Sequence, residues 1–262
     1  MIVGYIVRMN KRDPKGFPSF EDYLYHMTLS ILMTRRGLGI NDEIRFYSDK
    51  SGVEYLKDVL SISDDRIFIH EISEIDDDIT DPVVSIIVAA GHSQFLPERF
   101  IIISDAIYIE DISSLPPSNI YFLSSIHWSN AIVDSRIQDA SKSISRWSDL
   151  SGMKPESKYL HCSIIGGISS PVWIDLSNII MIKEEYTSMM NEYETSVFVS
   201  NYFCRSTEIN EFILNDVAVR VPPKRRSDYS KHDKDNVERQ LKAMFNYQLT
   251  ALEKYLTKNR IF

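Results

Sequence analysis

Asp105 interrupts a run of strand-forming residues, FIIISDAIYI, near the middle of the chain. A buried strand normally excludes an ionised carboxylate, because removing the charge from water is costly unless a partner compensates it. The charge of Asp105 could be compensated in three ways: by a metal ion, by a helix terminus, or by solvent at the end of a strand. The residue therefore marks either a ligand site or an ordinary strand end.

Polar residues also stand where two earlier strands are predicted to end. Arg8 to Asn10 follow the first strand, and Ser48 with Asp49 close the second. Ligands of open parallel sheets bind outside the carboxyl ends of the strands. We therefore expect these polar residues to lie at the same edge of the sheet as Asp105.

Strands and helices are predicted to alternate through the first 116 residues. The strands cover 1–8, 43–49 and 66–72, with a fourth in the segment 99–116, and the helices cover 20–36, 52–60 and 82–97. The first helix has Ser19 as its N-cap and Gly37 as its stop. Such alternation predicts the α/β class, with an open, mostly parallel, twisted sheet and helices on both faces.

The pattern is less regular after Pro116. Strands are predicted at 119–128, 158–167 and 215–223, the second of them running into a turn at Gly166 and Gly167. Helices are predicted at 134–147, 169–193 and 233–259, while 194–203 fits a helix or a strand. The last helix, a C-terminal extension, has an apolar stripe of Leu241, Met244, Phe245, Leu249, Leu252 and Leu256. Residues 1–215 are predicted as one domain, with 216–262 packed on it.

The segment LPERFIIISDAIYIEDISSL resembles the central segment of GT-A-type nucleotide-sugar glycosyltransferases. It is closest to the retaining family that includes glycogenin and bacterial lipopolysaccharide galactosyltransferases. That family carries an Asp-X-Asp motif, and the register set by Asp111 places Asp105 on its second Asp and Ile103 on its first. The segment YLHCSIIGG resembles a later strand of the family, with His161 in place of an Asn and Ser163 in place of a Gly. The resemblance implies a GT-A-like fold.

The resemblance also implies a divalent metal ion, Mn²⁺ or Mg²⁺, that neutralises the diphosphate leaving group. Asp105 would be a metal ligand. With Ile103 in the other place, metal binding is weaker, supplied partly by another residue, or absent. The family's His-X-X-Gly-X-X-Lys element has no clean match, and His232 is the residue of comparable chemistry.

Near the sugar, the family places an acidic residue at the start of a helix, so Glu192 or Glu194 is the candidate. Glu194 and His161 are predicted as catalytic residues. The alternatives are a helix-start carboxylate favoured by the dipole and a core histidine. The residues predicted to border the nucleotide are Arg8, Asn10, Ser48, Asp49 and Ser104, against a surface role for Arg8.

The segment from Val219 to Arg239 carries seven basic residues in an otherwise acidic protein. Arg225 and Lys231 are predicted to cover the diphosphate. Contact with a polyanionic acceptor such as DNA is a second prediction, and a solvated loop is the alternative.

The composition of the chain limits the partners and the cellular compartment that we expect. The net charge of −8 argues against general affinity for nucleic acid or anionic membrane. Two cysteines are too few for a disulfide framework, and no window is apolar enough for a membrane span. A cytoplasmic protein with reduced thiols is expected.

The resemblance implies transfer of a sugar from a nucleoside diphosphate donor, expected to be UDP-linked, to an acceptor hydroxyl. The acceptor is expected to be a saccharide or hydroxymethylated phage DNA. The competing hypothesis is a GT-A-like binding protein that has lost catalysis, and a metal-independent transferase is a third.

Overall fold

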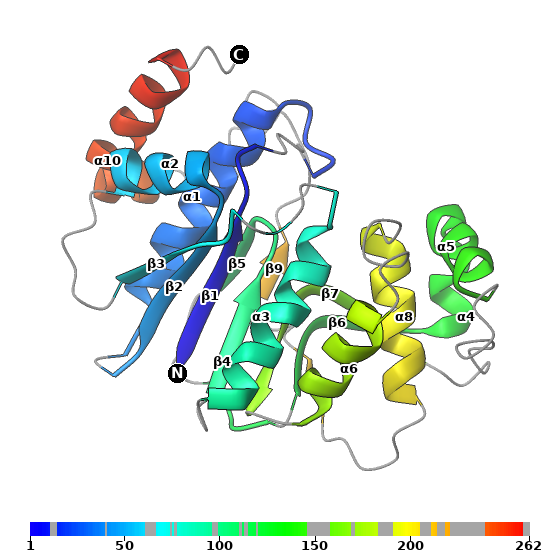
Figure 1. Ribbon diagram of the computed structural model, residues 1–262. Coiled ribbons are helices and arrows are strands. Elements are labelled where there is room, and N and C mark those ends of the chain that lie inside the picture. Colours follow the sequence, from blue (N-terminus) through cyan, green and yellow to red (C-terminus); the bar gives the residue numbers. More distant parts are fainter. Residues whose placement is uncertain are drawn as a thin grey trace. The chain divides into compact units, whose positions relative to one another are not determined.

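The computed structural model describes residues 1–10, 15–39, 41–60, 67–73, 75, 78–95, 99–109, 112, 115–118, 120–145, 158–168, 171–182, 191–204, 211–213, 218–220 and 239–258. The chain forms two compact units that alternate along the sequence (Figure 1). The first unit contains Met1–Ile6, Glu74–Ser104 and Pro116–Asp216, and the second contains Val7–Ser73, Asp105–Leu115 and Val217–Phe262. The predicted domain boundary after residue 215 falls next to the last of these crossings.

The first unit is built on an open sheet with the strand order β1-β4-β7-β6-β8. The strands are β1 (Ile2–Val7, whose last residue belongs to the second unit), β4 (Arg99–Ile103), β7 (Lys158–Ile168), β6 (Ile120–His127) and β8 (Glu211–Ile213). β1 pairs in parallel with β4, and β6 with β8, whereas β7 runs antiparallel to both of its neighbours. Because β1 and β4 are parallel, their carboxyl ends lie at the same edge.

Helices pack on this sheet and on one another. They are α3 (Asp81–Phe95), α4 (Trp128–Ala131), α5 (Ser135–Ser145), α6 (Pro171–Ile182) and α8 (Glu192–Cys204). α3 contacts α6, and α8 lies between β7 and α5. Trp173 of α6 is fully buried, with its ring edge-on to Phe100 and Phe203, and it forms the centre of the apolar core.

β7 differs from the predicted strand at its end. The turn expected at Gly166 and Gly167 is wrong, because both glycines lie inside the strand and pair with β4. A Cβ atom at Gly166 would stand 2.8 Å from the Cα of Ile101 and closer still to the carbonyl oxygen of Phe100. Glycine at this position therefore permits close approach of two backbones.

The second unit contains a parallel pair, β2 (Glu43–Ser48) with β3 (Ile67–Glu71), and an antiparallel pair, β5 (Ile107–Ile109) with β9 (Ala218–Arg220). Its helices are α1 (Phe20–Arg36), α2 (Lys50–Leu60) and α10 (Arg239–Lys258). The predicted N-cap of α1 is confirmed, since the Ser19 hydroxyl accepts a hydrogen bond from the Asp22 amide at 3.1 Å. The C-terminal helix packs on α2 and α1.

The α/β class and the open, mostly parallel sheet are confirmed. The segment 194–203 is helical, as part of α8. Leu249, Leu252 and Leu256 of the predicted stripe on α10 are buried; the side chains of Leu241, Met244 and Phe245 lie outside the described part of the chain. No helix among the described residues is long and apolar enough to cross a membrane.

His70 on β3 is expected to make a pH-dependent contribution to the stability of the second unit. Its ring stacks on Tyr47 with centroids 5.2 Å apart. Partial burial and the nearby Arg45 charge lower the pKa of His70 below 6.5. Since the unfolded chain then binds a proton more readily, this contribution is present above pH 6.5 and is lost as the pH falls through the folded pKa.

We expect His70→Gln to make the urea midpoint less sensitive to pH between about pH 7.5 and 5.5, the range in which an ordinary His titrates. The matched control is His127→Gln, at a histidine of β6 in the first unit whose side chain is exposed, as that of His70 is. An unchanged pH dependence in His70→Gln would contradict the assignment.

Candidate functional site

The carboxyl ends of β1 and β2 are tied together by Asp49. Its Oδ2 accepts a hydrogen bond from the Asn10 amide at 2.8 Å, and its Oδ1 accepts one from the Gly52 amide at 2.6 Å. Asp49 therefore caps α2 and fixes the residues after β1 at the same time. Two of the polar positions predicted from sequence, Asn10 and Asp49, are in direct contact.

Gly52 allows α2 to begin directly against the end of β1. A Cβ atom there would stand 2.7 Å from the carbonyl oxygen of Val7 and would overlap the Ser48 hydroxyl. That hydroxyl donates a hydrogen bond to the Val7 carbonyl at 2.6 Å. Ser48 thus holds the two strand ends together from a buried position. Arg8, next in the chain, is only 7% exposed.

Asn10 is exposed, unlike Arg8, Ser48 and Asp49, which are buried. Its Oδ1 accepts a hydrogen bond from the Ser51 hydroxyl at 2.8 Å, and Ser51 lies in the first turn of α2. Amide and hydroxyl groups of this kind suit the recognition of a polar ligand. We call Arg8, Asn10, Ser48 and Asp49 the strand-end group.

Asp105 lies between β4 and β5 and is 2% exposed. Its Oδ1 accepts a hydrogen bond from the Ala106 amide at 2.7 Å. Ser30 of α1 anchors Ile107, two residues after Asp105. The Ser30 hydroxyl donates a hydrogen bond to the Ile107 carbonyl and accepts one from the Ile107 amide. Of the three partners considered for Asp105, open solvent is excluded by this burial.

The described residues do not fit a divalent metal site. No group of three or more His, Cys, Asp or Glu side chains gathers in the described part of the chain. Ile103 is fully buried in β4 opposite Ile164, so an apolar side chain occupies the position of the family's first Asp. His232 and Asp111 lie outside the described residues. One carboxylate is a poor site for Mg²⁺ or Mn²⁺.

A second polar group lies on β7 and at the start of α8. The Ser163 hydroxyl donates to the Glu192 carboxylate at 3.2 Å, and His161 Nε2 lies 3.8 Å from Glu192 Oε1. His161 Nδ1 accepts a hydrogen bond from the Ser163 amide at 3.3 Å. The neutral ring therefore carries its proton on Nε2, on the side of Glu192. We call His161, Ser163 and Glu192 the histidine–glutamate group.

Glu194 makes different contacts from Glu192. Its Oε2 accepts a hydrogen bond from the Asn191 amide at 2.9 Å, while Asn191 Oδ1 accepts one from the Glu194 amide at 3.0 Å. This reciprocal pair is a capping box that starts α8. The geometry therefore favours Glu192, the other candidate from sequence, as the carboxylate that meets His161.

Two serines that the sequence analysis did not single out hold β7 in place. Ser200 accepts from the Leu160 amide at 2.8 Å, and Ser196 accepts from the Cys162 amide at 3.3 Å. They position the strand on both sides of His161. Their spacing of four residues places both on one face of α8, but the sequence left this segment open between helix and strand, so the spacing alone did not mark them. Cys162 itself is inert, since burial raises the pKa of its thiol to about 12.

Ser104 connects the histidine–glutamate group to Asp105 through the chain. Its amide donates to the Ser163 carbonyl at 3.0 Å, and its hydroxyl donates to the same oxygen at 3.4 Å. Asp105 is the next residue. A single peptide bond therefore connects a contact of the histidine–glutamate group to Asp105.

The basic segment begins close to Asp105. In the antiparallel pair of β5 and β9, Arg220 is opposite Ile107, two residues after Asp105. The predicted diphosphate contacts Arg225 and Lys231 follow Arg220 in sequence and lie outside the described residues.

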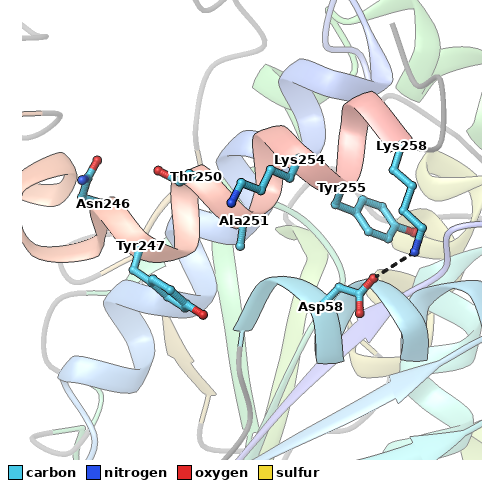
Figure 2. A pocket seen from close by; sticks show the side chains of 8 residues that line it. All are labelled: Asp58, Asn246, Tyr247, Thr250, Ala251, Lys254, Tyr255 and Lys258. Atoms are coloured by element: carbon cyan, nitrogen blue, oxygen red, sulfur yellow. Dashed lines mark ion pairs between the residues drawn. The ribbon is translucent and has the colours of Figure 1, made fainter.

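A pocket of about 490 Å³ lies between α2 and α10 (Figure 2). It is lined by Asp58, Asn246, Tyr247, Thr250, Ala251, Lys254, Tyr255 and Lys258. No residue predicted from sequence as a site residue lines this pocket.

Comparison with known proteins finds likeness to solved structures, at low sequence identity. No protein-family model matches the chain, and no curated protein matches it. Among solved structures, the chain is similar to the apo crystal structure of mouse xyloside xylosyltransferase 1. The identity is 11% and the TM-score 0.47, over 82% of this chain and 85% of that chain.

Proposed function

We propose that this protein is a glycosyltransferase, which moves a sugar from a nucleoside diphosphate donor to an acceptor hydroxyl. UDP is the proposed nucleotide, on the strength of the sequence resemblance. A saccharide, or the hydroxymethyl group of modified DNA, is the proposed acceptor.

The observation that best supports a glycosyltransferase is the position of two consecutive residues, Ser104 and Asp105, after the end of β4. Ser104 is bonded to Ser163 of the histidine–glutamate group, and Asp105 is a buried carboxylate after the end of β4. Polar side chains that follow parallel strands are the usual ligand contacts of an open α/β sheet. The residues of the strand-end group likewise lie at the carboxyl ends of β1 and β2.

The strand-end group is proposed to border the nucleotide, and the histidine–glutamate group to contact the sugar. As the bond to the leaving diphosphate breaks, positive charge develops at the anomeric carbon. A carboxylate held at the start of α8 would stabilise that charge. Ser163 donates a hydrogen bond to Glu192 Oε1 and His161 Nε2 lies 3.8 Å from the same oxygen, so the carboxylate is preorganised.

The negative charge of the leaving diphosphate needs a positive partner. Arg8 and the basic side chains Arg225 and Lys231 are proposed to supply it, since guanidinium and ammonium groups form strong charge-assisted bonds to phosphate. Metal dependence through Asp105 and His232 is the second proposal for this role, and the assay below separates the two.

The test is the slow hydrolysis of UDP-sugars, followed as release of UDP with Mn²⁺ and with EDTA. We expect release in the wild-type chain, and a drop of about tenfold or more in Asp105→Asn, which keeps the shape of the side chain but removes its charge. Asp139→Asn is the matched control, because Asp139 is an exposed carboxylate paired with Lys142 on α5. Release that survives EDTA supports neutralisation by the basic side chains, and release that requires Mn²⁺ supports the metal.

A catalytically inactive binding protein is the second candidate, and the buried Ile103 favours it. This candidate predicts a thermal shift with UDP-sugar but no release of UDP under either condition. The absence of any thermal shift with a panel of nucleotide-sugars, with or without Mn²⁺, would contradict both proposals.

A further inference from the structure

The pocket between α2 and α10 is formed by two rows of side chains on α10. One row is Asn246, Thr250, Lys254 and Lys258, and the other is Tyr247, Ala251 and Tyr255. Residues four apart share a helix face, so the rows run side by side. The small side chain of Ala251 stands between two tyrosines, which leaves a hollow there (Figure 2).

One wall of this hollow is held firmly. Tyr255 is buried, and its ring meets Tyr55 of α2 edge-on with centroids 5.4 Å apart. The Tyr55 hydroxyl is hydrogen-bonded to Thr28 of α1. Packing among three helices therefore fixes the Tyr255 ring. Tyr247, on the other side, is 70% exposed and presents its ring to solvent.

The charge of the lining is positive. Lys254 and Lys258 bring two ammonium groups, and Asp58 of α2 brings the one carboxylate (Figure 2). Lys258 lies 3.9 Å from Asp58, and both side chains are exposed, so the ion pair is weak. Asn246 and Thr250 add neutral hydrogen-bonding groups along the same row. An anionic group is thus the complementary one for this row.

We propose that this pocket binds a small molecule with a flat aromatic ring and one anionic group, such as a phosphate monoester, a sulfate or a carboxylate. The ring lies over Ala251 between the two tyrosines, and the anion meets Lys254 and Lys258. The pocket volume falls in the range of about 300–1,000 Å³ that is usual for small-molecule sites. The proposal does not depend on glycosyl transfer.

The test is calorimetric titration of the full chain with phenyl phosphate, and with phenol and inorganic phosphate as the two halves of that probe. We expect saturable binding of phenyl phosphate at one site, and binding of each half weaker by about tenfold or more. Inorganic phosphate that binds as tightly as phenyl phosphate would overturn the role of the ring, and phenol that binds as tightly would overturn the role of the anion.

Two surface variants separate this site from any other. Tyr247→Ala and Lys254→Gln change exposed side chains and leave the packing of α10 in place, which far-ultraviolet circular dichroism would verify. Each is expected to weaken phenyl phosphate binding by about tenfold. Lys57→Gln is the control, because Lys57 is an exposed lysine of α2 outside the lining. The proposal is overturned if no saturable binding occurs, or if both variants bind as the wild type does.

Discussion

Replacement of Glu192 by Gln is expected to lower the rate of UDP-sugar turnover by about 100-fold, because it removes the negative charge proposed to stabilise the transition state. The change keeps a hydrogen-bond acceptor for the Ser163 hydroxyl, which donates to Glu192 at 3.2 Å. Folding should therefore be preserved, and kcat should fall more than the affinity for UDP. Steady-state kinetics and UDP titration on the same preparation measure both quantities.

Glu194→Gln is the matched control, two residues along the same helix turn. Glutamine also completes a capping box, so α8 should begin as before and turnover should change by less than about threefold. The opposite outcome, in which Glu194→Gln loses turnover and Glu192→Gln keeps it, would assign the catalytic carboxylate to Glu194, as first predicted from sequence.

Gly166→Ala is expected to cost about 3 kcal/mol of unfolding free energy, a large value for a single added methyl group. The new Cβ would meet the backbone of Phe100 and Ile101, and backbone atoms inside a sheet have little room to move. The strands β4 and β7 would have to separate at the centre of the first unit. Urea denaturation monitored by tryptophan fluorescence measures the change, since Trp173 packs against Phe100.

Gly91→Ala, within helix α3, is the control for the same chemical change. A Cβ atom there meets nothing within 4 Å. Alanine in a helix interior is better than glycine by about 0.5–1 kcal/mol, so this variant should be slightly more stable than the wild type. A Gly166→Ala chain as stable as Gly91→Ala would show that β4 and β7 are not packed as described.

The sequence predicts best where local signals are strong. Ser19 and Gly37 bound α1 because capping chemistry is read within a few residues. The segment 194–203 stayed open between helix and strand for a physical reason: its residues from Glu194 to Asn201 are buried on all sides, so no apolar face repeats with a helical period. The strand at 158–167 was predicted, but a turn was expected at its two glycines because the reason for Gly166 lies on β4, which is distant in sequence.

In the candidate site too, features set by neighbouring residues were predictable, whereas contacts between distant segments were not. Strand ends are visible in sequence, so Asn10, Ser48 and Asp49 were placed at the carboxyl ends of their strands in advance. The choice between Glu192 and Glu194 depends on where His161 lies and on which carboxylate closes a capping box. Those contacts come from β7 and from Asn191, and spacing alone does not separate the two residues.

The order of the two units along the chain has a consequence for synthesis in the cell. The first unit has all its segments once Asp216 has been made, but the second needs Val217–Phe262 to join Val7–Ser73. In particular, β9 and α10 supply partners to β5 and α2 from the far end of the chain. The N-terminal helices of the second unit therefore lack these partners until β9 and α10 have been synthesised and have left the ribosome, and in this interval a chaperone has most to shield.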